Sequence, residues 1–241
     1  MTIVANLEVV RARLAEACAR SGRGPSDVTL IAVSKTQPAA AVLEAAAAGV
    51  QHFGENRVEE SESKIPTVMA TIGAPVTWHM IGHIQSRKAK DVVALFDVAH
   101  SVDTLKLAER LSRFSVEQGR TLETFLEINI SGEASKSGLS AAGWDADAAL
   151  RDRLWSDVGA MLALPGLRVR GLMTMAPIVE DAELARPSFA GLRDLRDALA
   201  LSFGVALADL SMGMTDDYPV AIEEGATVVR IGRAIFGERN R

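Results

Sequence analysis

A lysine directly follows a run of strand-forming residues near the start of the chain. The sequence VTLIAVSKTQP at residues 28–38 carries apolar and branched side chains up to Val33, and then Ser34 and Lys35. A lysine at such a position is most often a solvated surface residue, but its apolar flanks favour an amine partly removed from water. Such an amine loses its proton more easily and can attack an aldehyde carbonyl to form a Schiff base. Lys35 is therefore the first candidate for chemistry.

A second candidate lies near the end of the chain, in LSMGMTDDYPVAIEEGATVVRIGRAIFG at residues 210–237. Short loops with glycine and hydroxyl side chains precede helical stretches here, and backbone N–H groups in such loops bind anions. Gly232 and Arg233 are the residues best placed to do so. Glycine turns often serve only as turns, so the pattern by itself leaves both interpretations open.

Two other polar groupings are weaker. His79 and His83 are four residues apart, a spacing that suits metal ligands on a helix, but they lie near the end of an expected strand without a carboxylate close in sequence. We expect no metal site there. Glu59, Glu60 and Glu62 form an acidic run that is most simply a solvated helix face.

The elements that must position these residues alternate regularly between strands and helices. Apolar residues three or four apart in residues 2–20 predict an opening amphipathic helix. Eight strand-forming runs follow, separated by helical stretches, at residues 28–34, 50–54, 76–82, 95–102, 123–131, 167–175, 206–212 and 227–232. Strands separated by helices pair in parallel. Eight such units predict a single-domain (β/α)8 barrel over residues 1–241, and an open doubly wound sheet is the alternative.

In such a barrel the active site lies where the strands end, because all eight C-terminal ends meet at one mouth. Polar residues stand at or just after the expected strand ends: Lys35, Asn56, His79, Ser101, Asn129, Thr174, Ser211, Thr215, Arg230 and Gly232. The most polar segment, residues 131–157, follows the fifth strand and is interpreted as a loop.

Composition narrows the possible partners. The chain has 26 basic and 31 acidic residues, so it lacks the strong positive field that nucleic acid requires. It has no run of eighteen apolar residues, and the first twenty residues include several charges, so we expect no membrane span and a cytoplasmic location. Cys18 is the only cysteine, which excludes an internal disulfide. No long exposed apolar seam stands out, which favours a monomer.

Eight motifs, taken in order, resemble the pyridoxal-phosphate homeostasis proteins of the YggS/PROSC type. They are AVSKTQP, FGENRVEE, WHMIGHIQSRK, SVDTLKLAERL, INISGEASKSGL, GLMTMAP, LSMGMTDD and VVRIGRAIFG, and they run from about residue 28 to residue 237. The resemblance implies a single barrel related to the barrel domain of alanine racemase, with pyridoxal 5′-phosphate held as an internal aldimine. Two positions depart from the family: Arg87 stands where Asn is common, and Thr215 where Ser is common.

The resemblance also implies roles for individual residues. Lys35 would be the Schiff-base lysine, and Arg230 would approach the pyridine nitrogen. The other residues implied at the cofactor are Asn56 and His79 along its sides, and Ser211, Thr215, Gly232 and the backbone of Arg233 at its phosphate. Lys136, in SKSG, would lie on a mobile loop after the fifth strand.

These roles suggest binding without catalysis. An arginine at the ring nitrogen disfavours protonation of that nitrogen, which weakens the cofactor as an electron sink. The related racemases also need a tyrosine from a second domain of a partner subunit, and this sequence ends four residues after Gly237. The only tyrosine, Tyr218, is expected near the phosphate loop, where it is poorly placed as a second base. We therefore expect a protein that holds pyridoxal phosphate and passes it to apo-enzymes.

Two alternatives remain at this stage. One is a one-domain amino-acid racemase or decarboxylase, with His79 or Lys136 as the acid or base, which would exchange the α-proton of an amino acid. The other is an aldolase that forms its Schiff base between Lys35 and a sugar phosphate, without pyridoxal phosphate.

Overall fold

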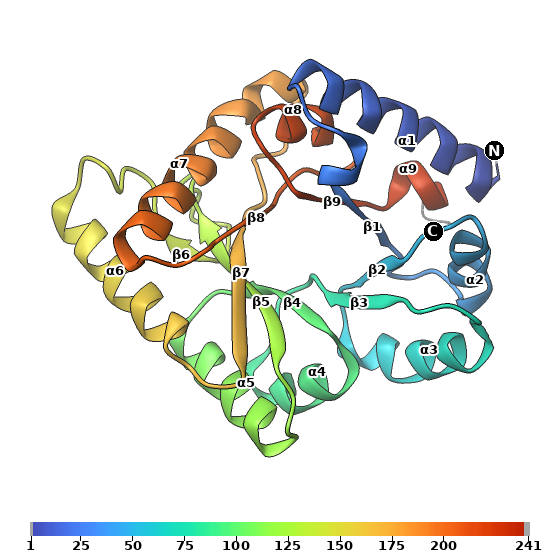
Figure 1. Ribbon diagram of the computed structural model, residues 1–241, viewed down its shortest axis with the longest axis horizontal. Coiled ribbons are helices and arrows are strands. Elements are labelled where there is room, and N and C mark those ends of the chain that lie inside the picture. Colours follow the sequence, from blue (N-terminus) through green and yellow to red (C-terminus); the bar gives the residue numbers. More distant parts are fainter. Residues whose placement is uncertain (1, 239–241) are drawn as a thin grey trace.

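Eight parallel strands close into a ring in the computed structural model, which describes residues 2–238 (Figure 1). The strands are β1 (Thr29–Val33), β2 (His52–Glu55), β3 (Thr77–Met80), β4 (Val98–Val102), β5 (Leu122–Asn129), β7 (Leu167–Met173), β8 (Asp209–Ser211) and β9 (Val228–Ile231). They follow chain order around the ring, which is closed by the pairings of β4 with β5 and of β9 with β1. The predicted (β/α)8 barrel is confirmed, and the open sheet is wrong.

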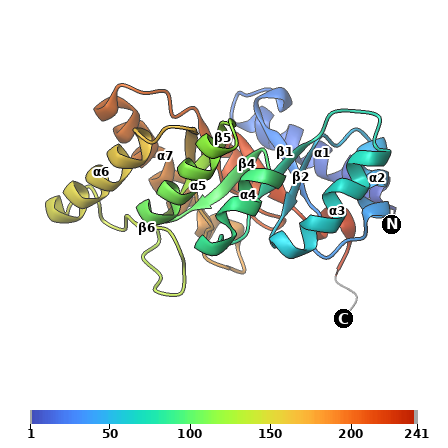
Figure 2. The ribbon, with the colours of Figure 1, turned by 90° about the horizontal axis from the view of Figure 1, so that it is seen from below.

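Helices cover the outside of this ring, since each parallel strand pair needs a crossover. They are α1 (Ile3–Arg20), α2 (Ala39–Ala47), α3 (Val58–Thr71), α4 (Ala89–Leu95), α5 (Leu105–Glu117), α6 (Ala148–Leu162), α7 (Arg186–Phe203), α8 (Tyr218–Glu223) and α9 (Arg233–Phe236). Single 3-10 turns are η1 (Pro25–Asp27), η2 (Ser86–Lys88) and η3 (Ala182–Ala185). Figure 2 shows α3, α4 and α5 next to one another along one side of the barrel. Over residues 2–238, none of these helices combines the length and the apolar character that crossing a bilayer requires.

The opening helix has the buried face that its sequence predicts. Leu7, Val10, Leu14 and Ala17 are buried, three or four residues apart, against the rest of the protein, and Ile3 is half-buried. α1 packs on α8 and α9, so the first helix covers the last two (Figure 1).

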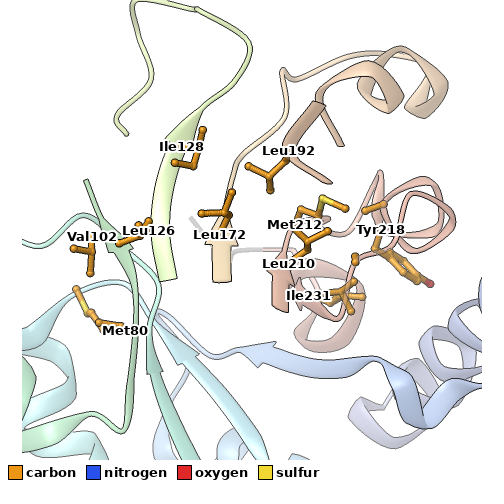
Figure 3. Packing of buried hydrophobic residues seen from close by; sticks show 14 of the residues in the cluster. Met80, Val102, Leu126, Ile128, Leu172, Leu192, Leu210, Met212, Tyr218 and Ile231 are labelled. Atoms are coloured by element: carbon orange, nitrogen blue, oxygen red, sulfur yellow. The ribbon is translucent and has the colours of Figure 1, made fainter. Parts of the chain in front are cut away.

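Apolar side chains pack in two layers, because successive residues of a strand point to opposite faces. The larger layer lies between the strands and the helices; in Figure 3, Leu172 of β7 and Leu210 of β8 lie near Leu192 of α7. A smaller cluster is formed by Ile31, Val98, Phe125, Met173 and Val228, one from each of five strands. Polar side chains on the strands of the barrel are buried as well, most notably those of His79, His100 and Arg230.

The polarity of the segment 131–157 predicts a single loop, and this prediction is wrong. It contains the two-residue strand β6 (Leu139–Ser140), which pairs beside the end of β5, and more than half of α6. The Asp147 side chain starts that helix by accepting from the Leu150 N–H at 3.0 Å. The buried face of α6 is narrow and lies mostly beyond residue 157, so its polar first half resembles a loop in sequence.

Candidate cofactor site at the mouth of the barrel

The end of β1 delivers Lys35 to the mouth formed by the C-terminal ends of the strands. β1 pairs with β2 on one side and with β9 on the other. Lys35 therefore follows the strand that stands between the loop with Asn56 and the loop with Gly232. A Cβ added to Gly232 would lie 3.4 Å from the Val33 side chain, so these two strand ends are in close contact. Residues predicted from opposite ends of the sequence thus meet at one mouth.

The other predicted phosphate residues are at the same mouth. Ser211 is the last residue of β8, Thr215 is in the loop that leads to α8, and Arg233 is the first residue of α9. The Arg233 side chain is exposed, and its Nη2 donates to both oxygens of Asp216 at 2.6 Å. This ion pair ties the loop after β8 to the start of α9.

A buried ion pair holds the residue that precedes Lys35. The Ser34 hydroxyl donates to Oε1 of Glu55 at 2.7 Å, and Nζ of Lys64 donates to the same oxygen and to the Ser34 carbonyl, both at 2.9 Å. Ser34 and Glu55 are fully buried, and Lys64 is 7% exposed. Burial raises the pKa of Glu55, while Ser34 and Lys64 act in the opposite direction. Among the described residues, Oε2 of Glu55 is buried without a hydrogen-bond partner.

The residue that follows Lys35 is held by the same group. The Thr36 N–H donates to Oε1 of Glu60 at 2.5 Å, and Nζ of Lys64 donates to that oxygen at 2.6 Å. Thr36 has φ of 65°, a conformation that is unfavourable for a branched residue and persists only when its surroundings enforce it. The backbone on both sides of Lys35 is therefore fixed by one lysine and two carboxylates.

This network was missed from the sequence. Glu60 was assigned to a solvated helix face, and that assignment is wrong for Glu60, whereas Glu59 and Glu62 are exposed. Two signals were available: Glu60 and Lys64 are four apart, the spacing of a helical ion pair, and Lys64 shares the buried face of α3 with Ile65.

His79 lies within β3 instead of after it, and it belongs to a row of rings in the barrel. Its Nε2 is 3.0 Å from Nδ1 of His52, and its Nδ1 is 2.9 Å from Nε2 of His100. Nδ1 of His100 is in turn 2.8 Å from the Ser211 hydroxyl. The His100 ring stacks on Phe125 with centroids 4.4 Å apart. Both nitrogens of His79 thus face other histidines, and its predicted place beside the cofactor stays a prediction.

Arg230 joins this row at Ser211. Its Nη1 donates to the Ser211 carbonyl at 2.8 Å and to the Ser211 hydroxyl at 2.6 Å, and its Nη2 donates to the Thr174 carbonyl at 2.9 Å. Burial lowers the pKa of Arg230 to about 10, against the attraction of Asp217 and Glu127. The guanidinium is therefore a buried cation at neutral pH.

Glu127, near the end of β5, is a titratable group that the sequence reading did not select. It is 3% exposed. Burial raises its pKa to about 7, with Asp103 acting in the same direction and Arg230 against it. The sequence did contain a signal for this residue, since Glu127 lies within the apolar strand TFLEIN. Burial of a lone acid is costly, so an acid in such a strand indicates a functional or perturbed group. The charge of this wall of the barrel therefore changes near neutral pH.

Two positions with open roles now have contacts. Nζ of Lys136 donates to the Met175 carbonyl at 2.7 Å, which joins the loop after β5 to the loop after β7. Nε of Arg87 donates to Gln85 at 3.0 Å. Arg87 also lines a cavity of about 360 Å³ that extends to Asn56.

Tyr218 points away from the mouth. It is 1% exposed at the start of α8, and its hydroxyl donates to the Val10 carbonyl of α1 at 3.4 Å. His83 is separate from His79, because its Nδ1 lies 3.4 Å from Asp103 and its ring is exposed. Within residues 2–238, no group of three His, Cys, Asp or Glu residues could hold a metal ion.

The mouth combines an amine, a buried guanidinium and hydroxyl groups with the N–H groups that begin α9, which have no partner inside the helix. An aldehyde and a phosphate ester on one small molecule match this donor set. The residues present therefore fit pyridoxal 5′-phosphate in chemical type.

Comparison with known proteins points the same way. Residues 5–240 match the family described as "Alanine racemase, N-terminal domain". A "Pyridoxal phosphate homeostasis protein" of Pseudomonas aeruginosa is 44% identical over 239 residues, covering 99% of this chain and 96% of that protein. One of the same name from Escherichia coli is 41% identical and covers 99% of this chain and 97% of that protein. The structure of PipY of Synechococcus elongatus with PLP bound has a TM-score of 0.77 and 39% identity, covering 93% of this chain and 100% of that one.

Proposed function

Because this chain belongs to the pyridoxal phosphate homeostasis proteins, within the alanine racemase N-terminal domain family, we propose that it binds pyridoxal 5′-phosphate and serves the homeostasis of that cofactor. The observation that carries the proposal is the setting of Lys35, which follows β1 at the mouth with both neighbouring residues fixed by Lys64, Glu55 and Glu60. A lysine on an ordinary surface loop needs no such support.

When bound, the cofactor supplies an aldehyde that combines reversibly with amines and a phosphate that anchors it. Lys35 provides the amine. Arg230 sets the charge at the pyridine end, and Asn56 and His79 border the ring. The phosphate is held by Ser211, Thr215, Gly232 and the backbone N–H of Arg233. A fixed backbone around Lys35 keeps its side chain directed at the mouth, which lowers the entropic cost of binding.

The proposal includes the absence of turnover. Tyr218 is buried against α1 with its hydroxyl on the Val10 carbonyl, so it is poorly placed to exchange a proton with a ligand at the mouth. The test is an incubation of the loaded protein with L-alanine in deuterated water. We expect no loss of the α-proton signal beyond that with free cofactor, and enzyme-dependent exchange would make the protein a racemase.

Binding itself is tested by dialysis against pyridoxal phosphate followed by measurement of the retained cofactor. The native chain should keep about one equivalent, and Lys35→Ala should keep far less. Lys106→Ala, which removes an exposed lysine from α5, is the matched control and should load like the native chain. Equal retention by all three proteins would remove Lys35 from the proposal.

Delivery to apo-enzymes, a monomeric state and a cytoplasmic location complete the proposal, and each has its own measurement. Transfer is followed as recovery of activity in an apo-enzyme mixed with the loaded protein, compared with the same amount of free cofactor. Sedimentation equilibrium decides the oligomeric state, and cell fractionation decides the location.

A further inference from the structure

The row of histidines in the barrel runs from one end of the strands to the other. His52 is the first residue of β2, and Ser211 is the last residue of β8. At its outer end, His52 lines a cavity of about 500 Å³ together with Arg11, Thr29 and Gln51. Thr29 is the first residue of β1, so this cavity is at the mouth opposite to Lys35. His52 is half-buried, whereas His79, His100 and Ser211 are at most 2% exposed.

The hydrogen-bond chemistry of imidazole couples these rings. A neutral imidazole donates from one nitrogen and accepts at the other. Since each contact in the row joins an Nδ1 to an Nε2 or to a hydroxyl, the tautomer of one ring fixes the tautomer of the next. The row has two orientations: all rings carry the proton on Nε2 and Ser211 donates to His100, or all carry it on Nδ1 and His100 donates to Ser211.

The orientation determines what Ser211 can offer a ligand. The Arg230 guanidinium always donates to the Ser211 hydroxyl, because arginine has no acceptor. In the first orientation the only proton of that hydroxyl is used by His100. In the second, His100 and Arg230 both donate to the oxygen, and the hydroxyl proton is available to an acceptor at the mouth.

We propose that His52, His79 and His100 are a proton relay that sets the direction of the Ser211 hydroxyl, and thereby its hydrogen bond to a phosphate ester, from the opposite mouth of the barrel. The ligand part of this inference rests on the proposed function, and the relay itself does not. In this relay the three histidines act through Ser211 as positioning residues, a role separate from the predicted place of His79 beside the cofactor.

The proton balance of one passage is complete. Starting with all rings protonated on Nε2, Ser211 would give its proton to Nδ1 of His100 and would take one from a proton donor at the mouth. His100 gives its Nε2 proton to Nδ1 of His79, and His79 gives its Nε2 proton to Nδ1 of His52. His52, now carrying two protons, releases the one on Nε2 to water in the cavity. One proton enters and one leaves, and every ring ends as the other tautomer.

Acid selects the second orientation. A protonated His52 must donate from Nδ1, which forces His79 and His100 to donate onward and turns the Ser211 proton toward the mouth. The charged groups that face the row are Arg170 of β7, held by Glu123 of β5 and Asp209 of β8, Arg230 of β9, and Arg11 of α1 in the cavity. Burial, and then Arg170, lowers the pKa of His52, so this ring at the open end of the row takes up its charge at a lower pH than an ordinary histidine.

The relay is tested first on the ligand-free protein, by ¹⁵N NMR of histidine-labelled protein across pH. The chain has four histidines, so the exposed His83 is an internal control. We expect His52, His79 and His100 to change tautomer together in one transition. Three independent transitions, or one tautomer throughout, would overturn the relay whether or not the protein binds the cofactor.

The consequence for the ligand is tested with His52→Asn. The Asn amide can replace the Nδ1 contact to His79, but it cannot take up a proton. As pH falls through the transition, the affinity for pyridoxal phosphate should rise in both proteins, but about tenfold more in the native chain than in His52→Asn. A tenfold difference is the size expected for one hydrogen bond to an anion. The titration of the phosphate is common to both proteins and cancels. His83→Gln should behave like the native chain, and identical pH profiles for all three would contradict the link to Ser211.

Discussion

Lys64 is the residue on which the setting of Lys35 depends most. It donates to the Ser34 carbonyl, to Glu55 and to Glu60, and Glu60 in turn accepts from the Thr36 N–H. Without its charge, two carboxylates would face each other close to a buried backbone. Glu60, which accepts from the N–H of the strained Thr36, would then lose the cation that holds it in place.

Replacement of Lys64 by Met keeps the length of the side chain and removes its charge. We expect Lys64→Met to lower the free energy of unfolding by about 3–5 kcal/mol, as the removal of one partner from a buried pair does, and to reduce cofactor retention. Urea denaturation measures the first effect, and adding Glu55→Gln should recover part of it because the uncompensated carboxylate is gone.

Lys88→Met, at a half-exposed lysine with three acidic neighbours, is the control and should change the midpoint little. A double variant no more stable than Lys64→Met would refute the network.

Glu127 makes stability depend on pH in a defined direction. Its pKa of about 7 in the folded protein is above the ordinary value near 4.5, so the folded state holds the extra proton between these values. Stability from this group is complete below the lower value and is lost as pH rises to the higher one. From pH 5 to pH 8, Glu127→Gln should gain about 2–3 kcal/mol in unfolding free energy relative to the native chain. A difference between the two proteins that stays constant over this range in urea titrations would contradict the assignment.

The sequence predicts which residues lie at the mouth where they follow a strand, but it does not predict which polar side chains contact one another inside the barrel. Lys35, Asn56 and Gly232 interrupt apolar runs at their ends, and a parallel barrel brings all such ends to one mouth. His52 and His100 lie within strands, where one sequence does not show which polar side chains meet across the ring.

At the scale of elements, the loop between β8 and α8 depends on one glycine. Gly213 has φ of 95°, and a Cβ there would lie 2.7 Å from Cβ of Ala221 and 3.0 Å from Cα of Tyr218. The Met214 N–H donates to Asp217 at 2.6 Å and completes the turn. This turn places Thr215 at the mouth.

Gly213→Ala should therefore be more costly than an ordinary substitution at positive φ. Gly22 is a matched control, because it has φ of 68° and no atom within 4 Å of an added Cβ. We expect Gly213→Ala to lose about 1–3 kcal/mol more than Gly22→Ala in thermal or urea unfolding, since only the first adds overpacking to the backbone strain. It should also weaken cofactor binding, which Gly22→Ala should not. Equal losses would show that the turn tolerates the movement of α8.

The alternation of strands and helices was predictable because the strands are short apolar runs and the crossovers are longer and amphipathic. Each of the eight expected runs overlaps a strand of the ring, with ends that differ by a few residues. The elements that were missed carry weak patterns: the first half of α6 contains several charged residues, and β6 has two residues that pair only because they lie beside β5.

The whole molecule places its two groups of buried polar residues at different depths. The Ser34, Glu55 and Lys64 group lies beside Lys35, and the histidine row crosses the barrel to the opposite mouth. The first group fixes the backbone on both sides of that lysine. The second connects Ser211 and Arg230 to the cavity at the opposite mouth.

The central claim, that Lys35 is the residue that takes up pyridoxal phosphate, is tested most directly by covalent trapping. The protein is incubated with the cofactor and reduced with borohydride, and the modified peptide is identified by mass spectrometry. We predict one phosphopyridoxyl group, on the peptide that contains Lys35. Labels spread over surface lysines, or no label, would contradict the claim and favour a Schiff-base aldolase that acts on a sugar phosphate.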